Sequence, residues 1–222
     1  HIVPVPRLWS HLGLAWGVAR HPSEGLFIPA HVRPLFCRTP TVITVHDLGY
    51  LHFPQTYPLP QRIYLNWATY YSARRSSHII ADSRSTRADL LKHYQIDPAK
   101  VTVVHPGFDP TPFADAARTT RRSDLPSTYL LHVGTLQPRK NLLRLLEALA
   151  TLRDHPAKPC LVCVGRRGWL DDPIRKQVQR LRLQARVHFL GYVSPDELPN
   201  LYAHAIACIA PSLYEGFGFT PL

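Results

Sequence analysis

The stretch TYLLHVGTLQPRKNLLRLLEAL (residues 128–149) contains an apolar run, a turn and a helical pattern in succession. Residues 128–135 are predicted to form a strand buried on both faces, because the run is nearly continuous in apolar residues rather than alternating. The helical pattern covers 141–154, where four leucines recur at helical spacing: Leu142, Leu145, Leu146 and Leu149. A strand, a turn and a helix in this order predict an α/β fold with a parallel sheet.

The same pattern repeats on both sides of this stretch. Further strands are predicted at 41–47, 77–83, 100–107, 160–168, 186–192 and 205–212. Helices are predicted between them, one of which opens with Asp82 or Ser83 as its cap. Residues 110–127 are polar and rich in proline, without an apolar period. We therefore expect two doubly wound units: an N-terminal domain at 1–112, a linker at 113–127 and a C-terminal domain at 128–222.

Composition limits the possible functions of the chain. It has 222 residues, of which 45% are hydrophobic, and this predicts a globular protein. Apolar stretches fall short of the roughly 18–20 residues of a membrane span. The formal charge of +11 favours a polyanionic partner such as nucleic acid, an anionic membrane surface or a phosphorylated ligand, although a solubilising surface would have the same charge. No methionine occurs, so the chain is interpreted as a piece of something longer.

Four cysteines are present, and two of them form a C-x-x-C pair, Cys160 and Cys163. The pair lies in a predicted strand, where residues three apart point to opposite faces. No second pair of cysteines or histidines is near, so core thiols are favoured over a zinc site. Unpaired thiols fit a reducing cytoplasm.

The turn after the strand at 128–135 contains the first candidate site. Gly134 and Thr135 form the turn, and Arg139 and Lys140 stand where the helix begins. The start of a helix exposes unpaired N–H groups and the positive end of its dipole, so two cations there predict a diphosphate site. A solvated basic pair is the alternative. The stretch is not a Walker loop, because no second glycine precedes the lysine and no Ser or Thr follows it.

Two further candidates also follow predicted strands. In PSLYEGFGFTPL (211–222), Gly216 and Gly218 allow close approach to a ligand, and Glu215 can accept hydrogen bonds from hydroxyl groups. Hydroxyl and phosphate recognition together indicate a sugar nucleotide, although a plain tight turn gives the same pattern. His46 lies at the carboxyl end of the strand predicted at 41–47 and could donate to a sugar hydroxyl, or serve a structural role. His105 is a weaker candidate, because the Pro-Gly after it indicates a turn.

The ordered motifs resemble one enzyme family along nearly the whole chain. The matching segments are TVHDLGYLHFPQTYP, IIADSRSTRADLLKHY, VVHPGFD, YLLHVGTLQPRKNLLRLLEAL, VHFLGYVSPDELPNLYAHA and PSLYEGFGFTPL. This set resembles the family 4 retaining glycosyltransferases of the GT-B fold. The resemblance implies two Rossmann-like domains facing across a cleft, both incomplete in this chain. It also implies a nucleotide sugar held mainly by the C-terminal domain, no metal and no cofactor.

The resemblance also implies roles for individual residues. Arg139 and Lys140 match the pair that neutralises the departing donor diphosphate, and His46 resembles the histidine near the transferred sugar. Glu215 matches the first acid of an E-x7-E element, beside the amides of Gly216, Phe217 and Gly218. Tyr192 and Val193 correspond to the region whose backbone reads the base. The second acid would fall at position 223, and nothing near the start resembles the family's first strand and glycine-rich loop, so the chain looks cut from a longer enzyme.

The resemblance predicts transfer of a mannose- or glucose-type sugar, with retention of configuration, to a glycan or a lipid-linked acceptor. Family habit favours GDP-mannose over UDP-glucose as the donor. The protein is expected to be cytoplasmic, with possible contact to the anionic inner membrane leaflet, and to bind no nucleic acid. No Asp-x-Asp motif occurs, which favours the cations at 139 and 140 in place of a metal. Two alternatives stay open: a folded, inactive nucleotide-binding fragment and a basic nucleic-acid-binding protein, for which no motif is found.

Overall fold

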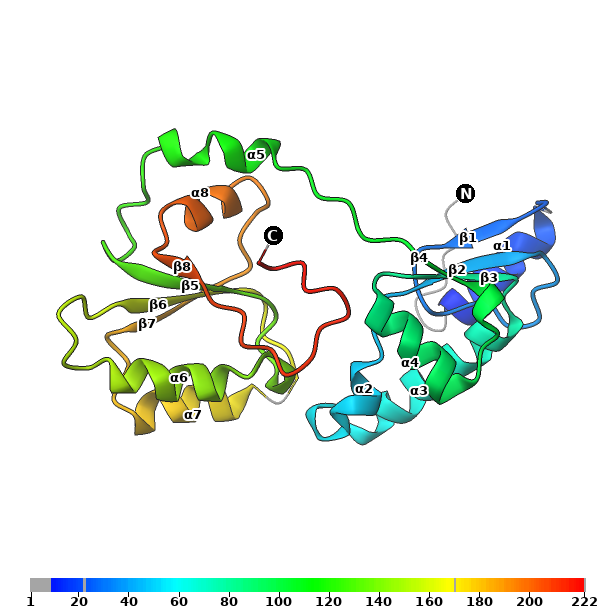
Figure 1. Ribbon diagram of the computed structural model, residues 1–222, viewed down its shortest axis with the longest axis horizontal. Coiled ribbons are helices and arrows are strands. Elements are labelled where there is room, and N and C mark those ends of the chain that lie inside the picture. The colour runs from blue at the N-terminus through cyan, green and yellow to red at the C-terminus, as the bar shows by residue number, and fades with distance from the viewer. Residues whose placement is uncertain (1–8, 22, 170, 222) are drawn as a thin grey trace. The chain divides into compact units, whose positions relative to one another are not determined.

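The computed structural model describes residues 9–21, 23–169 and 171–221, and they form two compact α/β units (Figure 1). The first unit extends to Pro106 and also includes Glu215–Phe217, whereas the second comprises Gly107–Tyr214 and the residues from Gly218 onward. The chain thus passes between the units at Pro106, close to the predicted end of the first domain at 112. The predicted domain limits stay a prediction.

The first unit contains a four-stranded parallel sheet in the order β1-β2-β3-β4. Its strands are β1 (Leu26–Ile28), β2 (Thr41–Val45), β3 (His78–Ala81) and β4 (Val101–Val103). Its helices are α1 (Leu14–Arg20), α2 (Gly49–His52), α3 (Leu59–Arg75) and α4 (Arg84–Tyr94), with a π-helical turn at Trp9–Gly13 and 3-10 turns at Pro54–Thr56 and Pro98–Lys100. The core of this unit is centred on Ile43, Ile79 and Leu90, which are fully buried.

The second unit contains a four-stranded parallel sheet in the order β7-β6-β5-β8. Its strands are β5 (Tyr129–Val133), β6 (Cys160–Val164), β7 (Val187–Gly191) and β8 (Ala207–Cys208). Its helices are α5 (Thr111–Ala114), α6 (Leu142–Thr151), α7 (Asp172–Arg180) and α8 (Leu198–Ala203), with 3-10 turns at Ala116–Arg118 and Pro138–Lys140.

Helices cover both faces of the second sheet (Figure 1). The leucines of α6 and the apolar residues of α7 pack on one face together with Cys163, while Leu201 of α8 packs on the other face with Tyr129. Cys160 contacts the α8 face, so the two thiols point to opposite faces, as the strand period predicts. Burial raises the pKa of the Cys163 thiol to about 12, and all four cysteines are free.

The predicted strands are confirmed, with shorter ends. The largest difference is at 205–212, where only Ala207–Cys208 pair as β8 with β5. The rest of that apolar run leaves the sheet to form the loop that precedes Glu215, because Pro211 has no N–H for a ladder. β1, α1 and α3 are elements that the sequence patterns did not predict. Ser83 is the cap of α4, and its side chain accepts a hydrogen bond from the Thr86 amide at 3.1 Å.

The predicted linker, residues 113–127, belongs to the second unit and packs against α8. Phe113 lies edge-on to Tyr202, with ring centroids 5.7 Å apart. Asn200 donates to the Thr119 hydroxyl at 2.7 Å, and Arg122 forms an ion pair with Glu197 at 3.1 Å. These contacts give the polar, proline-rich segment a fixed position in this unit. Among the described residues, no helix combines the length and apolar character needed to cross a membrane.

Candidate active site

The strand order of the second sheet indicates where a ligand would bind. From β5 the chain proceeds to β6 and β7 on one side, and then returns to the other side of β5 with β8. The order therefore reverses between β5 and β8. In open α/β sheets, ligands bind outside the carboxyl ends of the strands at such a reversal. The two loops that leave this point are 134–141 after β5 and 209–214 after β8.

Tight backbone packing forms the base of the loop after β5. Gly134 has φ of +152° and its amide donates to the Val164 carbonyl at 2.8 Å. Gly165, with φ of +139°, follows β6, and a Cβ atom there would lie 2.1 Å from the Gly134 oxygen. Because a side chain on Gly165 would overlap the backbone of Gly134, the loops after β5 and β6 pack directly against each other. Thr135, the other predicted turn residue, is partly exposed at this place.

Lys140 returns over the turn that begins at Gly134. It ends a 3-10 turn, and Asn141 then adopts a left-handed conformation before α6 begins at Leu142. The Lys140 Cε and Nζ atoms lie 3.2 and 3.6 Å from the position that a Cβ atom on Gly134 would occupy. The fold thus brings together Gly134 and Lys140, which the sequence analysis grouped in one site. The ammonium group lies at the switch point, near the amino end of α6.

Arg139 connects the two loops of the switch point. Its Nη1 donates to the Tyr214 carbonyl at 2.6 Å, and its own carbonyl accepts from the Leu213 amide at 2.9 Å. Asn141 adds a third bond, from Nδ2 to the Pro211 carbonyl at 3.1 Å. Arg139 is only 9% exposed, so it is not the solvated half of a basic pair. These bonds give Arg139 a structural role in positioning residues 211–214.

The Glu215 motif is divided between the two units. Glu215, Gly216 and Phe217 belong to the first unit, whereas Gly218, with φ of +85°, belongs to the second. Within the first unit, a Cβ atom on Gly216 would lie 2.0 Å from the His46 oxygen, so only glycine allows this contact. Two predicted site residues, His46 and Gly216, are therefore neighbours.

Tyr192 and Val193 follow β7 and differ in their surroundings. Tyr192 is 62% exposed, and the Arg166 guanidinium lies 4.8 Å from the centroid of its ring. Val193 packs its side chain against the core on the α8 face of the sheet. Only the Tyr192 side chain is therefore presented to solvent at the carboxyl end of β7.

In the first unit, histidines and an aspartate follow successive strands. His46 follows β2, and its two ring nitrogens lie 2.7 Å from the Asp82 carboxylate and 3.2 Å from the Pro29 carbonyl. Both partners are hydrogen-bond acceptors, so the two ring nitrogens are engaged within the first unit. His105 follows β4 and donates to the Asp82 carbonyl at 2.9 Å. His46 therefore makes bonds of the kind expected for a structural role, one of the two roles predicted for it. Its side chain is nevertheless 53% exposed.

The sequence analysis missed several residues of these sites. His31 follows β1, and its pKa is lowered by burial and secondarily by the charge of His46, against an opposing effect of Asp47. Asp82 holds His46, but the sequence analysis considered it only as a helix cap. His132, buried in β5, has Nδ1 2.9 Å from the Ile209 carbonyl. For Asp82 and His132 the signal, a polar residue in or directly after a predicted apolar strand, was visible in the sequence, whereas the strand before His31 was not predicted.

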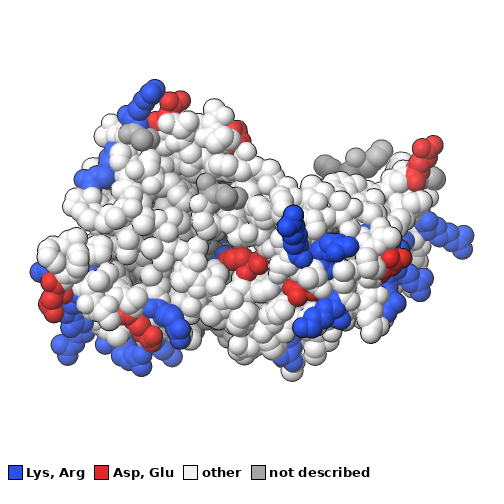
Figure 2. Space-filling model, in the orientation of Figure 1, with Lys and Arg blue, Asp and Glu red and all other residues white. Residues whose placement is uncertain are grey.

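Charged side chains are dispersed over the visible face of the molecule. Figure 2 shows Lys and Arg side chains in several separate groups, with Asp and Glu side chains among them. Double-stranded nucleic acid presents regularly spaced phosphates, and proteins that bind it commonly offer a continuous basic face. Taken one at a time, neither unit shows its described Lys and Arg side chains in one continuous basic stripe on this face (Figure 2).

Solved structures define the fold class. The chain aligns with a sucrose-phosphate synthase from Thermosynechococcus elongatus at a TM-score of 0.72 and 22% identity, over 93% of this chain and 55% of that one. It aligns with WaaG, a glycosyltransferase of lipopolysaccharide biosynthesis, at a TM-score of 0.69 and 19% identity, over 92% and 58% of the two chains. Anabaena HepE in complex with UDP-glucose gives a TM-score of 0.62 at 22% identity, over 79% and 47%. The chain thus has the α/β architecture of the GT-B glycosyltransferases.

Two family models together match nearly the whole chain. Glycosyltransferase Family 4 matches residues 19–112, and Glycosyl transferases group 1 matches residues 114–222. The chain belongs to this family of glycosyltransferases. The O-antigen chain mannosyltransferase B of Escherichia coli is 31% identical over 183 residues, which cover 80% of this chain and 48% of that protein. A D-inositol 3-phosphate glycosyltransferase of Rhodococcus opacus is 32% identical, over 66% of this chain and 35% of that protein. The chain spans about half the length of the first of these relatives and about a third of the second.

Proposed function

We propose that the chain is the part of a glycosyltransferase that binds a nucleotide diphosphate sugar and transfers the sugar to a hydroxyl acceptor with retention of configuration. Membership of the family supports a nucleotide-sugar-dependent transferase. The observation that carries the proposal is the position of the Lys140 ammonium beside Gly134, at the reversal of strand order in the second unit.

The proposed chemistry depends on the charge that develops on the leaving group. As the anomeric bond lengthens, negative charge grows on the terminal phosphate of the nucleotide. A fixed ammonium group and the amino end of α6 can stabilise that charge, and preorganised groups of this kind contribute several kcal/mol. Since Lys140 and Arg139 supply positive charge at the same loop, we propose that transfer needs neither a metal nor a cofactor.

The remaining site residues receive roles by the same proposal. Glu215 accepts hydrogen bonds from the donor sugar, beside the amides at Gly216, Phe217 and Gly218. Tyr192 and Val193 contribute backbone contacts to the base, and Gly134 with Thr135 contacts the diphosphate. His46 acts near the transferred sugar. Its bond to Asp82 holds the ring in one orientation, and donation to a sugar hydroxyl would use Nε2, which would exchange its 3.2 Å contact with the Pro29 carbonyl for the sugar.

The names of the relatives favour mannose as the transferred sugar. Two of them are O-antigen mannosyltransferases, of Escherichia coli and Salmonella typhimurium. HepE has been solved with UDP and with UDP-glucose, so UDP-glucose is the second candidate. We propose GDP-mannose as the donor and a glycan or a lipid-linked glycan as the acceptor, with transfer in the cytoplasm or at the inner face of the membrane.

The test is donor binding and transfer by the chain and by matched lysine variants. GDP-mannose and UDP-glucose are each titrated while thermal unfolding is followed, because a ligand that binds the folded state raises Tm. Lys140→Ala is expected to weaken donor binding about tenfold or more, which corresponds to about 1.4 kcal/mol. Lys176→Ala is the control. Lys176 is an exposed residue of α7 in the same unit, and its variant should bind the donor as the parent does.

Transfer is then measured with radiolabelled donors, with and without added Mg²⁺ or Mn²⁺, and the anomeric configuration of the product is determined by NMR. Equal rates without added metal and a retained configuration are expected. Unimpaired binding and transfer by Lys140→Ala would remove the proposed role of this residue. Inversion of configuration or dependence on added metal would contradict the proposed mechanism.

A further inference from the structure

Two histidines and an aspartate of the first unit converge outside the strand ends. His52, Asp89 and His93 each offer one ligand atom, and these three atoms all lie within 4.8 Å of one another. The His52 Nε2 atom is 2.8 Å from the Asp89 Oδ2 atom, and the rings of His52 and His93 meet edge to face, with centroids 5.7 Å apart. Among the described residues, this is a group of side chains spaced for a metal ion.

The secondary structure explains why these side chains meet. Asp89 and His93 are four residues apart on α4, so they lie on one face of that helix, one turn from each other. His52 is the last residue of α2, and α2 begins at Gly49, whose amide donates to the Asp47 carboxylate at 2.8 Å. The position of His52 is therefore set by a short helix that is anchored at its start.

The three side chains combine one buried carboxylate with two histidines that solvent can reach. Asp89 is only 7% exposed, whereas the side chain of His52 is 34% exposed and His93 is exposed. The carboxylate is thus the buried ligand, and the two imidazole rings are the ligands that solvent can reach. An ion could enter and retain a water molecule as a further ligand.

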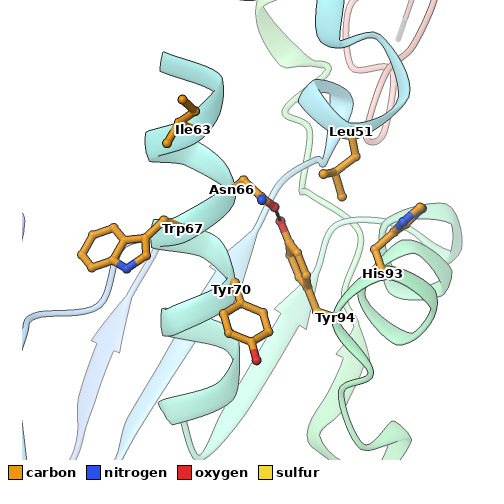
Figure 3. Close-up of a pocket in the computed structure, with 7 residues that line it drawn as sticks. All are labelled: Leu51, Ile63, Asn66, Trp67, Tyr70, His93 and Tyr94. Carbon is orange, nitrogen blue, oxygen red and sulfur yellow. Dashed lines mark hydrogen bonds between the residues drawn. The ribbon is translucent and has the colours of Figure 1, made fainter. Parts of the chain in front are cut away.

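A pocket beside His93 provides the access. It has a volume of about 600 Å³ and is lined by residues of α2, α3 and α4. Figure 3 shows Leu51 and His93 on one side of this pocket and Trp67 of α3 on the other. Of the three proposed ligands, His93 lines this pocket, so an ion can reach its ring from solvent-accessible space. A proposed metal site needs such an entry path.

The chemistry of the ligands indicates which ion would bind. Imidazole nitrogen and carboxylate oxygen are the ligands of zinc sites with three protein ligands, in which water takes a fourth, tetrahedral position. Magnesium and calcium prefer sets of oxygen ligands, and two histidines do not suit them. Zinc proteins use an arrangement in which two ligands lie four residues apart on one helix and a third comes from another element.

An ordinary ion pair explains only part of the cluster. The bond from His52 to Asp89 would connect α2 with α4 without a metal, and it needs no third residue. His93 adds a third ligand atom within 4.8 Å of the other two, and its ring meets that of His52 edge to face. The net charge of +11 disfavours any cation, but charges farther away than about 8 Å are largely screened at physiological ionic strength.

We propose that His52, Asp89 and His93 form a zinc site that connects the end of α2 to α4. The ion takes the place of the hydrogen bond between His52 and Asp89, whose proton is released to solvent, and adds His93 as a third ligand. Because α2 directly follows the loop that contains His46 and Asp47, zinc would fix the segment that leaves β2. The site is independent of the proposed sugar transfer, since none of its ligands belongs to the candidate active site.

The test compares zinc binding by the 222-residue chain and by single histidine variants. Equilibrium dialysis with Zn²⁺ is expected to give one ion per chain, and at about a hundredfold excess over Kd, Tm should rise by at least about 5 °C relative to the chelated sample. His93→Ala should lower the affinity about tenfold or more. His93 is exposed, so this variant is expected to fold. His78→Ala, which removes a histidine of β3 in the same unit, is the control and should keep full affinity.

Co²⁺ provides a second readout, because its visible spectrum reports on coordination geometry. The parent chain should give the intense absorption of a tetrahedral site, and His52→Ala and His93→Ala should lose it, whereas His78→Ala should not. Mg²⁺ should leave Tm unchanged. If Zn²⁺ has no effect on Tm, or if its effect is the same in His93→Ala and the parent, the proposal is wrong and the cluster is an ion pair with a neighbouring ring.

Discussion

Arg139 illustrates how one residue can combine two roles. The resemblance to family 4 enzymes gives it the task of neutralising phosphate charge, whereas the fold uses its guanidinium to hold the Tyr214 carbonyl. The guanidinium has five N–H donors in a planar fork, so a bond to one carbonyl leaves other donors for further partners. Loss of activity on its substitution would therefore not separate catalysis from structure.

We predict that Arg139→Ala destabilises the second unit by about 1.5–3 kcal/mol, the usual contribution of a buried hydrogen bond to a charged group. Urea unfolding of the variant and of the parent measures the difference. Arg144→Ala removes an exposed arginine of α6 in the same unit and should change stability by less than about 0.5 kcal/mol. Equal stability of both variants would contradict the structural role of Arg139.

The sequence suggests candidate residues but not the partners that they bond to. Arg139, Lys140 and His46 could be selected because charged or polar residues directly follow apolar runs. Their partners lie far along the chain: Tyr214 is 75 residues from Arg139, and Asp82 is 36 residues from His46. A local pattern contains no information on such pairs, and the buried bonds of Arg139 could therefore not be predicted.

At the level of elements, apolar runs identified seven of the strands, but the longest helix was missed. α3 reverses the usual pattern, because small residues face the sheet and aromatic residues face outward. Its buried residues are Ala68, Thr69, Ser72 and Ala73, whereas Trp67 and Tyr70 are 47% and 45% exposed. An apolar stripe is the main signal of a helix in a sequence, and here large apolar residues do not mark the buried side. β1 was missed because its apolar run, Leu26–Ile28, is bounded closely by Gly25 and Pro29, whereas the runs around β4 and β8 are longer.

The backbones of Gly134 and Gly165 pack closely at the ends of β5 and β6, and this contact should be sensitive to substitution. Gly165 has positive φ, and a Cβ atom there would overlap the Gly134 carbonyl oxygen at 2.1 Å. Because backbone must move and the conformation is strained for alanine, we predict that Gly165→Ala destabilises the second unit by at least about 2 kcal/mol. Far-UV circular dichroism during urea unfolding measures the change.

Gly107→Ala is the matched control for this substitution. A Cβ atom on Gly107 has nothing within 4 Å, and its φ is not in the left-handed region. We expect a change in stability within about 0.5 kcal/mol for this variant. If Gly165→Ala is as stable as Gly107→Ala, the loops after β5 and β6 are not held as tightly as the fold indicates.

At the level of the whole molecule, the sequence indicated two units because an apolar pattern is interrupted around residues 110–127. The family models divide the chain in nearly the same place, at 112 and 114. The pattern could not indicate that residues 113–127 pack on α8, because that packing uses isolated apolar residues such as Phe113 and Leu125, and polar bonds. A local sequence pattern also could not predict that residues 215–217 belong to the first unit while residue 218 belongs to the second.

Separate cores lead to the last prediction. The core around Ile43 lies in the first unit, and the core around Leu146 lies in the second. Each unit with its own core is expected to unfold as a cooperative body. Leu146→Ala removes a side chain that is 1% exposed and should destabilise its unit by about 2–5 kcal/mol. Hydrogen exchange should then quicken for the amides of β5 and β6, while those of β2 and β3 keep their protection. Ile43→Ala should have the converse effect. Loss of protection in both sheets from either substitution would mean that the two cores unfold as one.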